Sequence, residues 1–212
     1  MKITILYDNT AFWPELKSDW GFSALVETEK RTILFDTGSD GSILLENMKK
    51  LEIDPSSVDD VFISHNHFDH VGGLSAFLNE NNNVTVIVPS SLRGIRNAKE
   101  VIHVKRSMEL YEDIYSTGEL DFIEQSMVVR IDKGLVIMAG CSHPKIKHIL
   151  DAASKFGDVY AIIGGLHGFN EYDLFKNLSL ICPTHCTQHI EDIKSLYPEK
   201  YLEGGAGKII EI

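Results

Sequence analysis

The segment His65-Asn66-His67-Phe68-Asp69-His70 constrains the fold more than any other part of the sequence. It directly follows Val61-Phe62-Ile63-Ser64, an apolar run typical of a short buried strand. Residues two apart on an extended backbone point to the same side, so His65 and His67 can reach one metal ion. Asp69 and His70 lie just past the strand, where they can face a second ion. The pattern favours a metal site over the alternative, a cluster of exposed polar loop residues.

The rest of the chain alternates between strand-like and helix-like segments. Alternating or continuous apolar runs predict strands at 3–7, 22–27, 32–35, 61–64, 84–88, 126–131, 135–139, 159–163, 180–182 and 208–212. Helical spacing predicts helices at 39–51, at 71–78 and after Pro144. Hairpins mixed with strand-to-helix crossings indicate a mixed sheet system covered by helices, and not a doubly wound parallel sheet.

Composition limits the partners and the compartment. The chain has 212 residues, of which 43% are hydrophobic, and a formal net charge of −11, so nucleic acid is not an expected partner. No apolar run is long enough to cross a membrane, and the start of the chain does not resemble a signal peptide. The three cysteines form an odd set, which favours reduced thiols. We therefore expect a cytoplasmic protein with a small-molecule substrate; the sequence does not indicate an oligomeric state.

The chain resembles the metallo-β-lactamase superfamily, whose H-x-H-x-D-H signature is matched by His65, His67, Asp69 and His70. The resemblance extends over nearly the whole chain through Ile33-Leu34-Phe35-Asp36-Thr37-Gly38, Val71-Gly72-Gly73, Gly140-Cys141-Ser142-His143 and Pro183-Thr184-His185-Cys186-Thr187. It is strongest for a subgroup described as dihydropterin-type synthases. The resemblance implies an α+β fold: a four-layer αββα sandwich of two mixed β-sheets with helices on both outer faces. It also implies one domain over residues 1–212, with a metal cleft where the strands ending near Ser64, Ala139 and Ile181 meet.

The superfamily's usual ligand pattern is broken at one place. Its third histidine normally precedes a Gly-Asp pair, but here Gly140-Cys141 stands at that position and no histidine occurs in the twenty residues before it. We therefore expect His143 to join His65 and His67 around the first ion. Cys141 is left with three roles: binding an ion, orienting His143, or filling space as a small buried residue.

The second ion needs a ligand from another strand end. His185 lies 44 residues beyond Cys141, as the resemblance implies for the final histidine, and is expected to join Asp69 and His70. His167 is its competitor: it is interpreted as a substrate-binding residue, as an alternative ligand or as a loop histidine satisfied by backbone carbonyls. The remaining histidines are not expected to take part in the site: His103 is expected within a strand, and His148 and His189 within helices, where surface placement is commoner than catalysis.

This site predicts a metal-dependent hydrolase acting on a small ester, lactone or phosphate-containing molecule. One or two divalent ions would supply hydroxide at neutral pH; zinc suits the ligands best, and iron, manganese and nickel are alternatives. Asp69 is the expected catalytic residue, orienting the hydroxide and accepting its proton. A dihydropterin-type transferase is one alternative. Iron-based redox or sensing is the other, ranked last because relatives with oxygen chemistry usually carry Glu where His67 stands.

Overall fold

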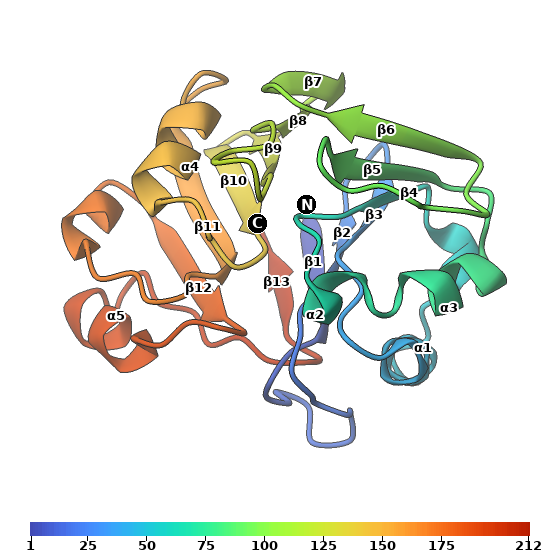
Figure 1. The fold of residues 1–212 in the computed structure, drawn as a ribbon. Coiled ribbons are helices and arrows are strands. Elements are labelled where there is room, and N and C mark those ends of the chain that lie inside the picture. The colour runs from blue at the N-terminus through green and yellow to red at the C-terminus, as the bar shows by residue number, and fades with distance from the viewer.

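Two mixed β-sheets packed face to face form the centre of the protein, which we describe from a computed structural model of residues 1–212 (Figure 1). The seven-stranded sheet has the spatial order β13 (Ile209–Glu211), β1 (Lys2–Tyr7), β2 (Ser23–Glu27), β3 (Thr32–Phe35), β4 (Asp60–Phe62), β5 (Thr85–Pro89) and β6 (Glu100–Val104). The six-stranded sheet has the order β12 (Leu180–Thr184), β11 (Val159–Gly165), β10 (Gly134–Ala139), β9 (Met127–Ile131), β8 (Ile114–Ser116) and β7 (Met108–Tyr111). Each sheet contains both parallel and antiparallel pairs.

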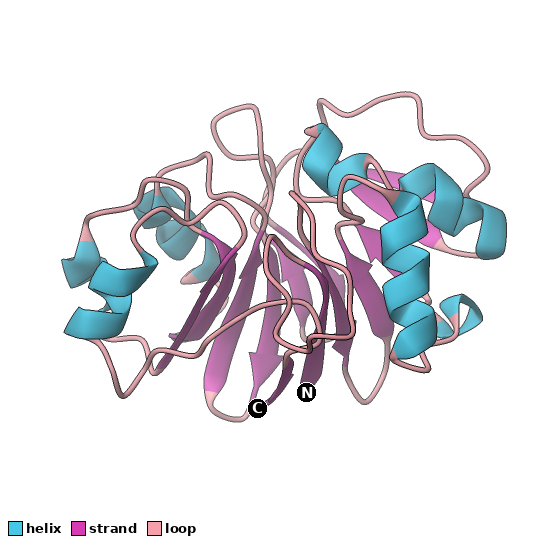
Figure 2. Ribbon diagram, turned by 90° about the horizontal axis from the view of Figure 1, so that it is seen from below, coloured by secondary structure: helices cyan, strands magenta, loops and turns pink.

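Helices cover the outer face of each sheet, as Figure 2 shows from below. Helices α1 (Gly41–Lys50) and α3 (Leu74–Glu80) lie outside the seven-stranded sheet, together with the short α2 (Phe68–Val71) and the 3-10 turn Pro55–Ser57. Helices α4 (Ile146–Ala153) and α5 (Ile190–Leu196), with the 3-10 turn Tyr172–Phe175, lie outside the six-stranded sheet. The expected four-layer αββα sandwich is therefore confirmed. None of the helices combines the length and apolar character that crossing a bilayer requires.

Three apolar clusters correspond to the three interfaces between these layers. A cluster of 19 buried residues lies between the sheets, and clusters of 16 and 13 lie under the helices of each outer face. Neighbouring residues of one strand enter different clusters: Ile5 of β1 faces the other sheet, whereas Leu6 faces α1. This alternation is the period-two pattern that predicted the strands.

The predicted helix 71–78 is wrong in its bounds, and the glycine pair Gly72-Gly73 explains why. Helix α2 ends at Val71 and α3 begins at Leu74. A Cβ at Gly72 would lie 2.2 Å from the carbonyl oxygen of Ser39, and one at Gly73 would lie 2.2 Å from that of Thr37. The chain between the helices therefore passes directly against the turn after β3, and only glycine allows this approach.

The region between β5 and β9 contains strands that sequence reasoning did not locate. Strands β7 and β8 form an antiparallel hairpin at the edge of the six-stranded sheet. Met108 and Glu109 of β7 are exposed, so the segment lacks the apolar alternation that identifies a half-buried strand.

The stacked pair Phe35 and Phe62 tests the contribution of the interface between the sheets. The two rings are fully buried, with centroids 5.5 Å apart and planes 12° apart. We expect Phe35→Ala to lower the free energy of unfolding by about 3–5 kcal/mol because it leaves a cavity between the sheets. Denaturant unfolding measures this, with Phe122→Ala as the control, because Phe122 is 91% exposed. Equal destabilisation by the two variants would contradict this account of the core.

Candidate metal centre

The residues singled out in the sequence converge at one end of the two sheets. His65 and His67 follow β4, Asp69 and His70 lie in α2, Cys141 and His143 follow β10, and His185 follows β12. Strands β10, β11 and β12 are parallel, so their carboxyl ends lie at the same edge. The donor atoms form two groups, within each of which all atoms lie within 4.8 Å of one another.

The first group consists of His65, His67 and His143. The Nε2 atom of His65 lies 3.1 Å from Nδ1 of His67, and Nε2 of His143 lies 3.2 and 3.1 Å from these two atoms. Tetrahedral coordination with metal–nitrogen bonds of about 2.0–2.1 Å places ligand nitrogens about 3.3 Å apart. The triangle of ring nitrogens therefore matches the spacing that one ion requires.

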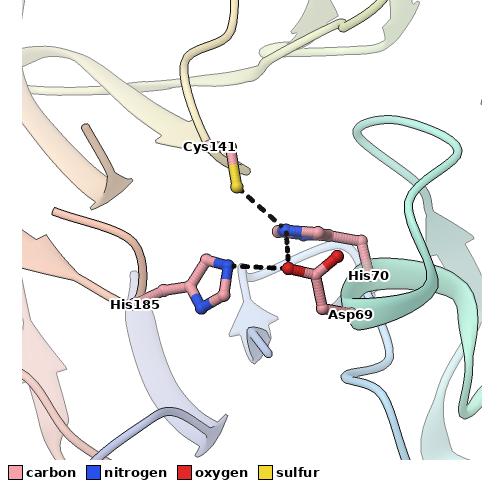
Figure 3. A group of neighbouring side chains, drawn as sticks. All are labelled: Asp69, His70, Cys141 and His185. Carbon is pink, nitrogen blue, oxygen red and sulfur yellow. Dashed lines mark hydrogen bonds and ion pairs between the residues drawn. The ribbon is translucent and has the colours of Figure 1, made fainter. Parts of the chain in front are cut away.

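The second group consists of Asp69, His70, Cys141 and His185, all of which are buried (Figure 3). The Nε2 atom of His70 lies 3.2 Å from Sγ of Cys141, and Nε2 of His185 lies 3.2 Å from Oδ2 of Asp69. Figure 3 shows the four side chains pointing toward one another. A thiol, two imidazoles and a carboxylate form a donor set that suits zinc.

One buried carboxylate, that of Asp36, orients histidines of both groups. Its Oδ2 accepts hydrogen bonds from Nδ1 of His70 and from Oγ of Ser64, each at 2.7 Å. Because the Ser64 hydroxyl donates to Asp36, it accepts from Nδ1 of His65 at 2.9 Å. Both Nδ1 atoms therefore carry the proton, so Nε2 of His65 and of His70 each present a lone pair to the centre.

Residues of the segment after β1 orient His185 in a similar way, through its Nδ1 atom and its backbone N–H. Its Nδ1 lies 2.9 Å from Oδ1 of Asn9, and its backbone N–H donates to the buried carboxylate of Asp8 at 2.8 Å. The opposite ring atom, Nε2, is buried and has no hydrogen-bond partner. A buried polar atom without a partner is costly, so this nitrogen supports a metal ion as the missing partner.

Glu124 fixes the loop that contains Cys141 and His143. Its Oε1 accepts the backbone N–H groups of Gly140, Cys141 and Ser142 at 3.0–3.1 Å, and its Oε2 accepts that of His143 at 2.9 Å. Burial raises the pKa of Glu124, and these N–H donors oppose the shift. One carboxylate thus sets the backbone of two donor residues at once.

The pKa shifts of His65, His143 and Asp69 suit cation binding, whereas the Asp36 carboxylate raises the pKa of His70 against the effect of burial. Burial and the neighbouring imidazoles lower the pKa of His65, and burial together with His67 lowers that of His143 to about 4. Burial acts to raise the pKa of Asp69, but the neighbouring imidazoles of His185 and His70 outweigh it, and the pKa is well below its usual value. The neighbouring Cys186 thiol and burial raise the pKa of Cys141. A cation that binds this sulfur must therefore displace the thiol proton.

The structure separates His143 and His185 from the other candidate histidines. His167 follows β11 and is exposed; its ring centroid lies 5.2 Å from that of His143, but it belongs to neither donor group. His103 in β6 and His148 in α4 are exposed, and His189 precedes α5 at its N-cap instead of lying within the helix.

Several residues that shape the centre were missed by sequence reasoning. Asp8, Asn9 and Glu124 do not belong to any motif in the sequence, and their partners lie far away in the chain. Asp36 did carry a signal, because it directly follows the strand predicted at 32–35 and begins the segment Asp36-Thr37-Gly38. Its orienting role requires the fold.

We expect Asp36→Asn to weaken metal binding about 10- to 100-fold, the cost typical of such supporting contacts. Asn tolerates the φ of 52° at this position, so the turn can persist. However, its amide places a donor against either the N–H of Ser64 or Nδ1–H of His70. Metal titration checks this, with Asp40→Asn as the control, because Asp40 only caps α1 and Asn is an equally good cap. Unchanged affinity in Asp36→Asn would refute the orienting role.

Comparisons with known proteins agree with this geometry. The family model described as the metallo-beta-lactamase superfamily matches residues 21–150. A protein from Methanocaldococcus jannaschii named 7,8-dihydropterin-6-methyl-4-(beta-D-ribofuranosyl)-aminobenzene-5'-phosphate synthase is 29% identical, with 96% of this chain and 92% of that protein covered. An uncharacterized protein of the same organism is also 29% identical, with 99% and 100% covered.

Among solved structures, the chain is similar to a protein described as a metal-dependent hydrolase of the beta-lactamase superfamily. The TM-score is 0.80 at 25% identity, with 100% of this chain and 99% of that one covered. The matched family model spans more than half of the sequence and contains nearly all of the converging donors. The chain therefore belongs to the metallo-β-lactamase superfamily, whose members bind divalent metals.

Proposed function

We propose that this protein is a metal-dependent hydrolase of a small ester, lactone or phosphate-containing substrate, with one or two divalent ions, zinc first among them. The main support for this proposal is the pair of adjacent donor groups. Hydrogen bonds from Nδ1 atoms to Asp36, Ser64 and Asn9 leave the Nε2 atoms of the same histidines free for a cation. His65, His67 and His143 would hold the first ion. Asp69, His70 and His185 would hold the second, with Cys141 added as a ligand.

Such ions lower the pKa of water toward neutrality and polarise a carbonyl or phosphoryl oxygen. Within this scheme Asp69 is both a ligand of the second ion and the acceptor of a proton. Its Oδ2 receives the contacts from Trp20, His70 and His185, which leaves Oδ1 to accept a proton from the attacking water. Its lowered pKa keeps the carboxylate ionised. His167, beside His143 on a pocket of about 330 Å³, is proposed as a substrate contact.

A dihydropterin-type transferase is the second candidate, favoured by the coverage of the Methanocaldococcus jannaschii synthase. Turnover in heavy-oxygen water separates the two reactions. Hydrolysis incorporates the label into a product, whereas condensation of a pterin alcohol with an amine acceptor does not. Under either reaction, we propose a small-molecule substrate; the net charge of −11 argues against a polyanionic partner.

The ligand assignment is tested by metal content after dialysis against buffered zinc. We expect His143→Ala to lose about one ion per chain, and His185→Ala and Cys141→Ser each to weaken the other ion, because catalytic sites need about three protein ligands. His167→Ala is the matched control and should retain the metal content of the parent. If His167→Ala loses an ion while His143→Ala and His185→Ala lose none, the assignment is wrong.

The role of Asp69 is tested by turnover of p-nitrophenyl acetate, N-hexanoyl homoserine lactone and bis(p-nitrophenyl) phosphate. We expect Asp69→Asn to lower kcat about 100- to 10,000-fold on whichever probe the zinc-loaded parent hydrolyses, because an amide accepts no proton. Asp132→Asn, an exposed change at the β9–β10 hairpin, is the control. A parent inactive on all three probes when fully loaded, or an Asp69→Asn variant as active as the parent, would reject the proposed reaction.

A further inference from the structure

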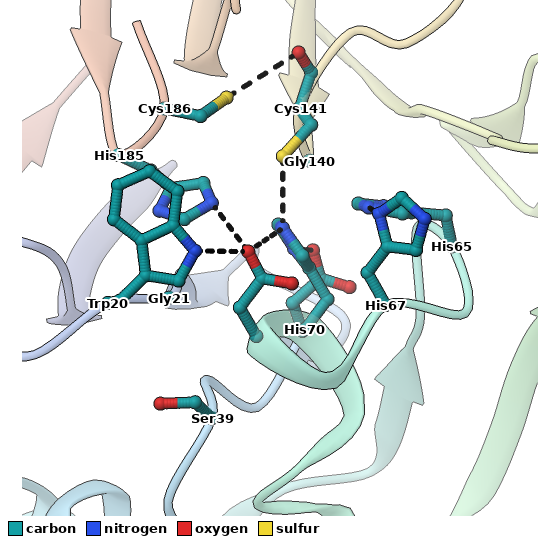
Figure 4. A network of polar contacts seen from close by, with 12 residues as sticks. Trp20, Gly21, Ser39, His65, His67, His70, Gly140, Cys141, His185 and Cys186 are labelled. Carbon is teal, nitrogen blue, oxygen red and sulfur yellow. Dashed lines mark hydrogen bonds and ion pairs between the residues drawn. The ribbon is translucent and has the colours of Figure 1, made fainter.

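The indole of Trp20 lies directly against the second donor group, although the residue belongs to the loop between β1 and β2 (Figure 4). Its Nε1–H donates to Oδ2 of Asp69 at 2.8 Å. Its ring centroid lies 4.9 Å from that of His185, with the planes at 57°. Trp20 is nevertheless 49% exposed, so the indole forms part of the wall of the centre and presents apolar surface to solvent.

The backbone beside Trp20 is tied to the same two residues. Oδ1 of Asn9 accepts from the N–H of Gly21 at 3.2 Å, and Nδ2 of Asn9 donates to the carbonyl of His185 at 2.9 Å. The N–H of Phe22 donates to the carbonyl of Asp69 at 3.1 Å. A Cβ at Gly21 would lie 2.8 Å from that carbonyl, so the loop passes very close to α2. The indole is therefore held in place before any substrate binds.

We propose that Trp20 is a substrate-positioning residue, which orients Asp69 through its N–H and stacks its exposed indole on a flat aromatic ring of the substrate. The inference deepens the proposed function and rests on it, since it names the substrate class of the same centre. A fixed aromatic face binds planar rings with little loss of conformational entropy. A ring stacked there places its polar substituent within reach of the donor groups, because the indole already contacts Asp69 and His185.

Three variants separate the two contributions of the indole. Trp20→Phe keeps an aromatic ring and removes the N–H, Trp20→Leu removes both, and Trp13→Leu is the matched control. Trp13 belongs to the same loop and is 39% exposed, but its backbone binds Ala206, away from the donor groups. Hydroxymethylpterin serves as the flat probe and N-butyryl homoserine lactone as the non-aromatic probe, both measured by calorimetry on the zinc-loaded proteins.

We expect Trp20→Leu to weaken hydroxymethylpterin binding about 3- to 10-fold, the range typical of a lost aromatic contact, and to leave lactone binding within about twofold. Trp20→Phe should bind the pterin nearly as well as the parent. In the cobalt-loaded proteins, the visible absorption bands should shift in both Trp20 variants and stay unchanged in Trp13→Leu. A parent that does not bind the pterin, a Trp20→Leu variant that binds it as tightly as the parent, or unshifted bands would overturn the proposal.

A second measurement covers the case in which Trp20→Leu does not fold. The chain has only two tryptophans, so in Trp13→Phe all indole emission comes from Trp20. Saturating hydroxymethylpterin should quench this emission by contact and energy transfer, and unchanged emission would contradict stacking. Failure here is distinguishable from failure of the proposed function, because metal content in His143→Ala and turnover in Asp69→Asn are measured in proteins that retain Trp20.

Discussion

The hydrogen bonds of the buried Asp36 carboxylate are the interaction on which the rest of the candidate metal centre depends. Without an acceptor beneath them, His65 and His70 could each place a proton toward the centre and repel a cation. Burying a carboxylate is costly unless donors surround it, and Asp36 receives three hydrogen bonds, from the N–H and Oγ of Ser64 and from His70. Glu124 and Asp8 are likewise buried carboxylates surrounded by donors, and they accept the backbone N–H groups of His143 and His185.

The sequence predicted those parts of the centre whose geometry is local. His65 and His67 lie on one side of an extended segment, and their spacing alone implied that both could reach one ion. His143 and His185 needed the family resemblance as well, because their position follows from which strand ends share an edge. The alternation of apolar residues was sufficient for the layers, since each strand divides its side chains between two clusters.

Other features could not be read from the sequence, for physical reasons. Glu124 binds four backbone N–H groups, and every residue except proline has one, so no residue pattern marks its partners. The break between α2 and α3 depends on how closely Gly72 and Gly73 approach Ser39 and Thr37, which is a tertiary contact. The contact between Trp20 and Asp69 joins residues 49 positions apart in the chain. A fold shared by proteins described as a hydrolase and as a synthase does not itself determine the substrate, so such contacts matter for specificity.

The position of the donor groups across both sheets has a mechanical consequence. His65 and His67 follow a strand of the seven-stranded sheet, whereas His143 follows one of the six-stranded sheet. The apolar layer between the sheets resists separation but gives little directional resistance to sliding, since dispersion contacts are weakly directional. A cation bound by residues of both sheets would oppose sliding of one sheet over the other. It would add about 4 kcal/mol to the free energy of unfolding when the free metal concentration is a thousand times the dissociation constant. The supply of metal in the cell would then determine how many damaging core substitutions this sandwich tolerates before it unfolds.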